Sequence, residues 1–136
     1  MLFRSLPETA YQADTTARVY EILSATAQRV LSQGCSVVLD AAFLRETERI
    51  VLADLARRHG ARFIGLFLTA DLATRISRIE QRRHDASDAT REVAMLQQTY
   101  AVGAMDWHVV DAGGVPSDTL RRARAFTAGS EPEDVR

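Results

Sequence analysis

The sequence has a single cysteine, no long apolar run and no excess of basic charge. One cysteine cannot form an internal disulfide, and the three histidines are too scattered along the chain to complete a Cys/His metal site. Cys35 begins an apolar stretch, so we expect it to behave as a small apolar residue.

The missing apolar runs and basic charge exclude further classes of protein. No window approaches the roughly 18 apolar residues of a membrane span, and the first residues lack the apolar core of a signal peptide. We therefore expect a cytoplasmic protein with no membrane partner. A net charge of −1 and a pI near 6.3 also argue against a nucleic-acid partner, because binding to a phosphate backbone is driven by basic excess.

What is present fits one α/β domain over residues 1–128, followed by a polar tail over 129–136. The 136 residues are 46% hydrophobic. Apolar residues recur at helical spacing in five segments, at about 14–33, 46–59, 71–82, 90–101 and 117–128. Asp71 can cap the third of these helices, and Ser117 or Asp118 can cap the fifth. Between the helical segments lie three short apolar runs that predict buried strands: Ser36–Asp40, Arg62–Thr69 and Trp107–Ala112. Strands that alternate with helices predict a parallel sheet.

Three arginines mark the helix after the second predicted strand. Arg75, Arg78 and Arg82 are spaced i, i+3 and i+7, which gathers them into an arc of roughly 60°. They form either a solvated basic face or a lid whose guanidinium groups close over a polyphosphate. The loop that follows is polar: its side chains either hold a lid turn or simply cap it, and they are Asp85, Ser87 and Asp88.

Two of the predicted strands end in an aspartate, Asp40 and Asp111. In open α/β sheets ligands bind at the carboxyl ends of the strands, and an aspartate at that position can hold Mg²⁺. Such aspartates also cap turns, so each alone is a weak signal. Arg45 and Arg49 follow Asp40 in the first turns of the next helix, where a cation opposes the helix dipole, and we expect them to face the same ligand.

The sequence has no phosphate-binding loop of the form G-x-x-x-x-G-K-[ST]. All 17 basic residues are arginines, so the lysine of that motif is absent. The glycines do not have the required spacing, and "DAGGVPSD" lacks the cation. A nucleotide site built from these residues would have no phosphate cradle of its own.

Several segments together resemble a P-loop kinase-like ATP-binding domain. They are "SVVLDAAFLRETER", "LARRHGARFIGLFLTADLATRISRIEQRR", "DASDAT" and "WHVVDAGG", which span about Tyr11 to Ala112. The resemblance is to the type related to gluconate kinase, polynucleotide kinase and zeta toxin. It is greatest to the ATP-binding half of bifunctional aminoglycoside phosphotransferase/ATP-binding proteins.

The resemblance implies a doubly wound sheet of order 2-3-1-4-5, with the three predicted strands as strands 3, 4 and 5. It also implies ATP and Mg²⁺ as cofactors and a small-molecule phosphate acceptor whose identity the residues do not give. Arg78 and Arg82 match lid arginines, and Asp40 matches the acid that holds Mg²⁺. We assign Arg83 and Asp111 to nucleotide binding and Arg45 and Arg49 to the substrate. Where the family has "DATFL", this chain has Ala42 in place of the threonine.

The family opens with strand 1, the phosphate-binding loop, a helix and strand 2 with an acidic base, and this chain begins after that point. At least a βαβ unit of roughly 30 residues is therefore expected to be absent. One hypothesis is a truncated ATP-dependent kinase or ATPase that is inactive alone and works with a fused or separate phosphotransferase domain. The alternative is a non-catalytic binding or interaction module derived from that fold.

The expected strand order also predicts how the sheet is built. Strand 1 would lie between Ser36–Asp40 and Arg62–Thr69, so both segments are left with an unpaired inner edge. Either these two segments pair directly or a gap remains between them. In both cases we expect a marginally stable protein that tends to associate.

Overall fold

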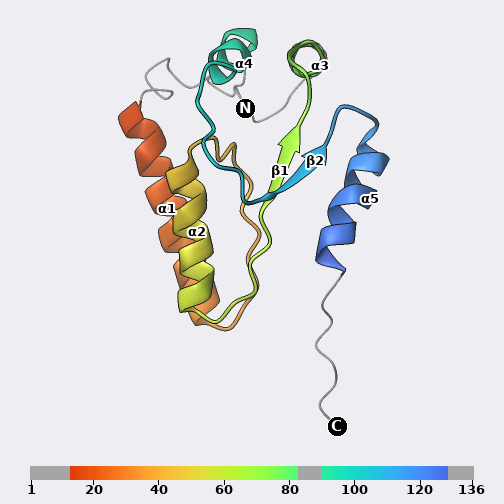
Figure 1. The fold of residues 1–136 in the computed structure, drawn as a ribbon. Coiled ribbons are helices and arrows are strands. Elements are labelled where there is room, and N and C mark those ends of the chain that lie inside the picture. Colours follow the sequence, from red (N-terminus) through yellow and green to blue (C-terminus); the bar gives the residue numbers. More distant parts are fainter. Residues whose placement is uncertain (1–12, 83–89, 129–136) are drawn as a thin grey trace, which may run out of the picture.

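The structure is a computed structural model that describes residues 13–82 and 90–128. Its helices and strands alternate along the chain as an α/β fold (Figure 1). In order they are α1 (Ala13–Ser32), α2 (Glu46–Arg58), β1 (Leu66–Thr69), α3 (Leu72–Gln81), α4 (Arg91–Gln97), β2 (His108–Asp111) and α5 (Pro116–Thr127).

A two-stranded parallel sheet lies at the centre of the fold. β1 pairs with β2 from Leu66 opposite His108 to Thr69 opposite Asp111. Figure 1 shows α1 and α2 on one side of this sheet and α5 on the other, with α3 and α4 beyond the carboxyl ends of the strands. The predicted α/β class, with a parallel sheet and flanking helices, is confirmed.

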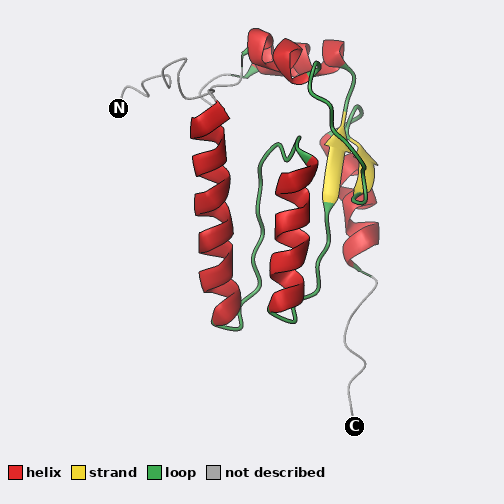
Figure 2. Ribbon diagram, turned by 60° about the vertical axis from the view of Figure 1, so that its left-hand side comes forward, coloured by secondary structure: helices red, strands yellow, loops and turns green. Residues whose placement is uncertain are grey.

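α5 covers one face of the sheet because its apolar side packs on β2. Val110 is only 1% exposed, and the His108 ring stacks on Phe126 with centroids 4.2 Å apart. On the opposite side, α1 and α2 run next to each other (Figure 2). They bury a small core made of Ala27, Phe43, Leu52 and Leu55. Burying such side chains is the main favourable term for the α1–α2 pair.

The predicted strand at Ser36–Asp40 is not a strand. Its side chains still alternate as they do in an extended chain: Val37 and Leu39 pack on the α1–α2 core, whereas Val38 is 93% exposed. The described residues give the segment no ladder partner, and it does not pair with β1. An apolar run becomes a strand only where a neighbour satisfies its backbone groups, so the prediction failed for lack of that neighbour. Of the two expected arrangements, the one with a gap is observed.

The other predicted boundaries need smaller corrections. Both strands are shorter than predicted, at four residues each, because pairing is limited to the residues that face each other. α4 ends at Gln97 rather than near Ala101. α5 begins at Pro116, before the expected caps Ser117 and Asp118, since proline has the backbone angle that a first helical residue needs.

None of the helices in the described part of the chain has the length and apolar content that crossing a bilayer requires.

The exposed inner edge generates a prediction about association. Val38 and Leu68 are 93% and 55% exposed, and β1 itself contains no charged residue. Val38→Lys should raise the monomer fraction in size-exclusion chromatography with light scattering, and it should change stability by less than about 0.5 kcal/mol. As the matched control, Val110→Lys should unfold the protein because Val110 is buried.

The opposite result is equally clear. An unsubstituted protein that elutes as a sharp monomer and unfolds cooperatively above about 60 °C would show that the open edge has no cost.

Candidate functional site at the carboxyl ends of the strands

The helix predicted to act as a lid is α3, which starts directly after β1 and is fixed there by its cap; we call it the lid helix after that prediction. Both carboxylate oxygens of Asp71 accept hydrogen bonds at 2.8 Å, one from the backbone N–H of Thr74 and one from its hydroxyl. These bonds hold the pKa of Asp71 below its ordinary value of 3.8. The capping role expected for Asp71 is confirmed.

Arg78 reaches from the lid helix to the turn that follows β2. Its Nη1 donates to the carbonyl oxygen of Ala112 at 2.6 Å, and its Nη2 donates to that of Gly114 at 2.7 Å. We call residues Asp111–Gly114 the strand-end turn. The half-buried Arg78 is thus brought to the carboxyl end of the sheet, as the sequence predicted for a lid residue.

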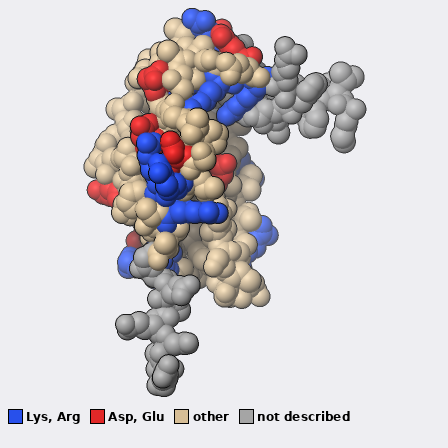
Figure 3. Space-filling view, turned by 90° about the vertical axis from the view of Figure 1, so that its right-hand side faces the viewer, with Lys and Arg blue, Asp and Glu red and all other residues tan. Residues whose placement is uncertain are grey.

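Asp111 stands at the start of this turn with its carboxylate 71% exposed. Its Oδ1 accepts from the N–H of Gly113 at 2.8 Å, and its Oδ2 lies 3.7 Å from Nη1 of Arg122. Arg122, on α5, also donates to the carbonyl oxygen of Asp111 at 2.8 Å. Figure 3 shows basic and acidic side chains gathered together on this side of the molecule.

Arg122 was not predicted as a site residue. The sequence spacing could have indicated it: α5 begins five residues after Asp111, so the second turn of α5, which contains Arg122, remains near the end of β2. The sequence predicted the last helix but assigned no role to its arginines.

Two of the three arginines, Arg75 and Arg78, are half-buried and do not form a solvated basic face, whereas Arg82 is exposed. Arg75 is half-buried and donates to the side chain of Gln98 at the end of α4, with its Nε buried. Arg82 is the C-cap of α3, where its backbone N–H donates to the carbonyls of Arg78 and Ile79. Arg75 and Arg78 therefore join α3 to two different neighbours.

The remaining predicted site residues are dispersed. Asp40 is exposed in the unpaired segment, and within the described chain its carboxylate makes no hydrogen bond or ion pair. Arg45 is the exposed N-cap of α2, with its N–H donating to Glu48 at 3.2 Å. Four predicted residues lie outside the described residues: Arg83, Asp85, Ser87 and Asp88.

Arg49 serves the fold rather than an open ligand crevice. The residue is 3% exposed, and both of its terminal nitrogens donate twice. Nη1 binds the carbonyls of Phe43 and Leu44 at 2.8 and 3.1 Å. Nη2 binds those of Val102 and Ala104, the latter at 2.9 Å. The expected substrate contact would require these four bonds to be given up, because only Nε–H remains.

The residue that Arg49 holds, Phe43, has an unusual backbone. Its φ is 45°, in the left-handed region that costs a bulky residue about 1 kcal/mol or more. Its N–H donates to the Tyr20 hydroxyl at 2.9 Å. Its ring contacts those of Tyr20 and Trp107, with centroids 5.4 and 5.2 Å apart. Packing and hydrogen bonds together offset the strain.

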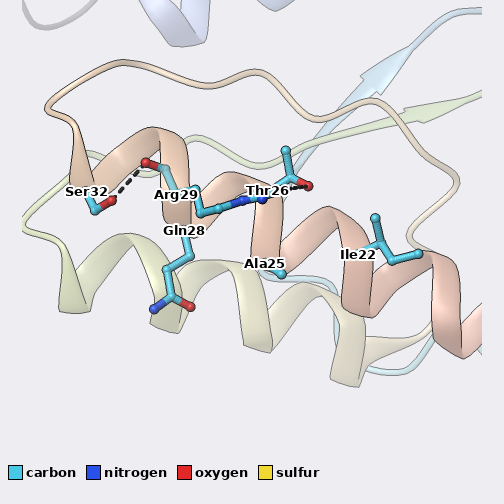
Figure 4. Close-up of a pocket in the computed structure, with 6 residues that line it drawn as sticks. All are labelled: Ile22, Ala25, Thr26, Gln28, Arg29 and Ser32. Carbon is cyan, nitrogen blue, oxygen red and sulfur yellow. Dashed lines mark hydrogen bonds between the residues drawn. The ribbon is translucent and has the colours of Figure 1, made fainter.

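Two surface hollows lie away from the strand ends. One is a depression on α1 alone, lined by Ile22, Ala25, Thr26, Gln28, Arg29 and Ser32 (Figure 4). The other, of about 500 Å³, is a groove between α1 and α2. The depression is lined by a single helix, so no second element could contact a ligand there. The groove is lined mainly by apolar residues, with charged side chains of both signs. Neither hollow resembles a polyphosphate site.

The geometry places a lid helix, an exposed strand-end aspartate and two arginines at one edge of a parallel sheet. Comparison of the sequence with known families gives a match over residues 1–102, to a family described as an AAA domain. The chain belongs to the AAA domain family. This is a P-loop NTPase-like family, and its members typically bind ATP with Mg²⁺. No curated protein and no solved structure matched the sequence significantly.

The described residues of this AAA domain suit the Mg²⁺ of a magnesium–ATP complex but provide no cradle for its phosphates. Mg²⁺ in phosphate sites takes one or two carboxylates together with the substrate phosphates, and the exposed Asp40 and Asp111 suit that requirement. Nowhere in the described ranges do three or more His, Cys, Asp or Glu side chains gather around one point. Arg78 and Arg122 donate to carbonyl oxygens of the strand-end turn. The turn therefore presents hydrogen-bond acceptors to these two side chains, whereas a phosphate needs N–H donors. That turn does not fit as a phosphate cradle.

Arg49 generates a prediction about the stability of this AAA domain. Arg49→Met keeps the apolar stem but leaves four backbone carbonyls without their donor, which should lower the free energy of unfolding by roughly 2–4 kcal/mol. Urea unfolding followed by circular dichroism measures the loss. Arg57→Met is the matched control: Arg57 is 73% exposed in an ion pair with Asp54, and its loss should leave the free energy of unfolding nearly unchanged.

Equal costs for the two substitutions would contradict the structural role of Arg49.

Tyr20 generates a prediction about pH. Burial raises the pKa of the Tyr20 hydroxyl above its ordinary value of 10.0, against a smaller lowering effect of the Phe43 N–H. The folded protein therefore holds this proton more tightly than the unfolded chain. Its contribution to stability is complete below pH 10.0 and is lost as the pH rises through the folded pKa.

Thermal unfolding at pH 9 to 11.5 tests this, over a range set around the tyrosine pKa of about 10. Tyr20→Phe should flatten the alkaline fall in melting temperature, whereas Tyr100→Phe, at an exposed position, should leave it unchanged. A parallel fall in all three proteins would show that Tyr20 is not responsible.

Proposed function

We propose that this chain is part of an ATP-dependent phosphotransferase of the small-molecule kinase type. One observation carries the proposal: the guanidinium of Arg78 extends from the lid helix to the carboxyl end of β2. That end of a parallel sheet is where ligands bind, and guanidinium groups suit polyphosphates. Membership of the P-loop NTPase-like AAA domain family supports the same ligand class.

Each residue then has a defined part. Arg78 and Arg82 neutralise the nucleotide phosphates from the lid, and Asp40 and Asp111 supply carboxylates on the sheet side, where Asp40 would hold Mg²⁺. Arg45 is exposed at the start of α2. Among the described residues its side chain does not bind backbone carbonyls as that of Arg49 does, so Arg45 is the better candidate for contact with the phosphate acceptor.

The chain as given is expected to be inactive alone. It has no lysine, and its described residues provide no backbone cradle for the phosphates. Positioning and electrostatic stabilisation supply almost all of the catalysis in phosphoryl transfer. A phosphate-binding loop and a general base would therefore have to come from residues outside this sequence, in the same or another polypeptide.

A second candidate function is a non-catalytic binding module. The unpaired edge of β1 and the 93% exposure of Val38 favour it, because an open apolar edge is a template for another polypeptide. The coding sequence upstream of Met1 discriminates between the two: an in-frame phosphate-binding loop favours the kinase, and a stop codon favours the module.

Titration of the ¹⁵N-labelled protein with MgATP tests the proposal. With only a partial set of charged contacts, the dissociation constant should be about millimolar or weaker. Amide shifts should concentrate at Gly113, Gly114 and the end of α3 near Arg78. Arg78→Met should abolish them, and Arg57→Met, which changes a distant exposed arginine, should leave them unchanged.

Two results would overturn the proposal: no shift at these amides at tens of millimolar MgATP, or shifts that persist in Arg78→Met. Magnesium tripolyphosphate and adenosine, titrated separately, show which end of the nucleotide produces each shift.

A further inference from the structure

The segment that carries Asp40 packs on the α1–α2 core through Val37 and Leu39 but has no backbone pairing within the described chain. Residues 36–40 form no ladder within the described chain, so backbone pairing does not fix their distance from the strands. The first strong attachment after Asp40 is at Phe43, whose N–H binds the hydroxyl of Tyr20 on α1 and whose carbonyl binds Arg49 on α2.

Arg49 connects this attachment to the strands. Its second terminal nitrogen holds the carbonyls of Val102 and Ala104, in the loop that leads into β2. Its guanidinium carbon also lies 5.9 Å from the ring centroid of Phe67, in the middle of β1. One buried group thus contacts the Asp40 segment, β1 and the chain before β2.

The aromatic rings make a second connection over the same span. Phe43 packs on Trp107, the residue immediately before β2, and Trp107 packs on Phe63, with centroids 5.7 Å apart. A Cβ added at Gly65, next to β1, would overlap the indole of Trp107, so the ring sits directly on the backbone there. Phe43 is therefore fixed both by hydrogen bonds and by packing.

The loop before β2 is held in addition by α2. The carboxylate of Glu46 accepts from the N–H of Ala104 at 3.3 Å. Gly103 has a φ of 72°, and a Cβ there would lie 2.5 Å from a carboxylate oxygen of Glu46. The close approach of this loop to the start of α2 is what brings its carbonyls within reach of Arg49.

We propose that Tyr20, Phe43 and Arg49 form a clamp that sets the position of Asp40 relative to Asp111, with Arg49 as a positioning residue. The strained backbone of Phe43 is the bend that directs the Asp40 segment toward the strand ends. The inference rests on the proposed function in one respect: it gives the two aspartates a common ligand, a magnesium–nucleotide complex.

The geometry separates this role from general support of the fold. Besides Phe43, the α1–α2 core contains Ala27, Leu52 and Leu55, and β1 and β2 have their own ladder. Without the clamp, and within the described part of the chain, the Asp40 segment keeps only the packing of Val37 and Leu39, and the loop over 102–104 keeps only its bond to Glu46. Loosening the clamp should therefore move these segments and leave the helix pair in place.

Distances between nitroxide labels test the clamp without any nucleotide. In a Cys35→Ser background, one label on Val38→Cys, at a position that is 93% exposed, reports the Asp40 segment, and one on Ala125→Cys, exposed on α5, reports the β2 side. Arg49→Lys should broaden this distance distribution about twofold, because one ammonium cannot span four carbonyls on two loops. Tyr20→Phe, which removes one bond of the clamp, should broaden it less.

A second label pair serves as the control. In a Cys35→Ser background, Arg18→Cys and Arg57→Cys place labels on exposed positions of α1 and α2. Their distribution should be unchanged by Arg49→Lys, as should the helix signal in circular dichroism. An unchanged distribution between the labels at Val38→Cys and Ala125→Cys would overturn the clamp. Broadening of both pairs with loss of helix signal would assign Arg49 to general folding and overturn it too.

Nucleotide titration then separates the clamp from the proposed function. In Arg49→Lys, MgATP shifts at Gly113 should remain and those at Asp40 should be lost. If the unsubstituted protein shows no shift at all, the proposed function fails, while the label distances still decide the clamp. If both sets of shifts survive in Arg49→Lys, Asp40 does not depend on Arg49.

Discussion

One buried guanidinium holds carbonyl oxygens from two loops that are more than fifty residues apart in the chain. The apolar spacing of each helix is a local pattern, whereas the placement of α2 against the strands depends on Arg49 and on the rings around it. A buried cation needs hydrogen bonds for every donor it takes out of water, and four backbone acceptors meet most of that need. In a wider sheet, backbone ladders would hold such segments together; here the buried guanidinium of Arg49 holds the two loops.

Most of the local structure was readable from the sequence because it follows from local physics. Apolar spacing predicted α1, α2 and α3 to within a residue or two, and the side chain of Asp71 caps α3 as expected. The parallel pairing of β1 and β2 followed from the alternation of helices and strands. The aspartate at the end of β2 and the lid arginine Arg78 were both identified as site residues, and the structure joins them through one turn.

What was not predicted depends on neighbours that no local pattern reveals. The run Ser36–Asp40 has the composition of a buried strand, but a strand also needs a partner, and sequence composition does not say whether one is present. Arg49 was read as a ligand residue because a cation in the first turns of a helix opposes the dipole. In the structure, carbonyl oxygens of two loops offset this unfavourable interaction with the helix dipole. Those contacts depend on where the loops lie, which no local sequence pattern indicates. The four predicted site residues after Arg82, one for nucleotide binding and three for the lid turn, lie outside the described structure, and their roles stay predictions.

Arg78 and Arg122 approach the strand-end turn from opposite elements, α3 and α5, and each is satisfied there by backbone oxygens. A guanidinium with five donors can keep one such bond and still bind a phosphate, which an ammonium does less readily. The exclusive use of arginine for basic residues in this sequence suits a site whose cations must serve the protein and a ligand at the same time.

The contact between Gly65 and Trp107 limits how this protein can change over evolutionary time. Any side chain at position 65 would collide with the indole, so a substitution there is tolerated only together with a smaller residue at 107. A smaller residue at 107, however, gives up the ring contacts to Phe43 and Phe63. The two positions are therefore expected to vary as a pair. A substitution at the start of β1 would also change the packing of Trp107 on Phe43, and with it the position of the segment that carries Asp40.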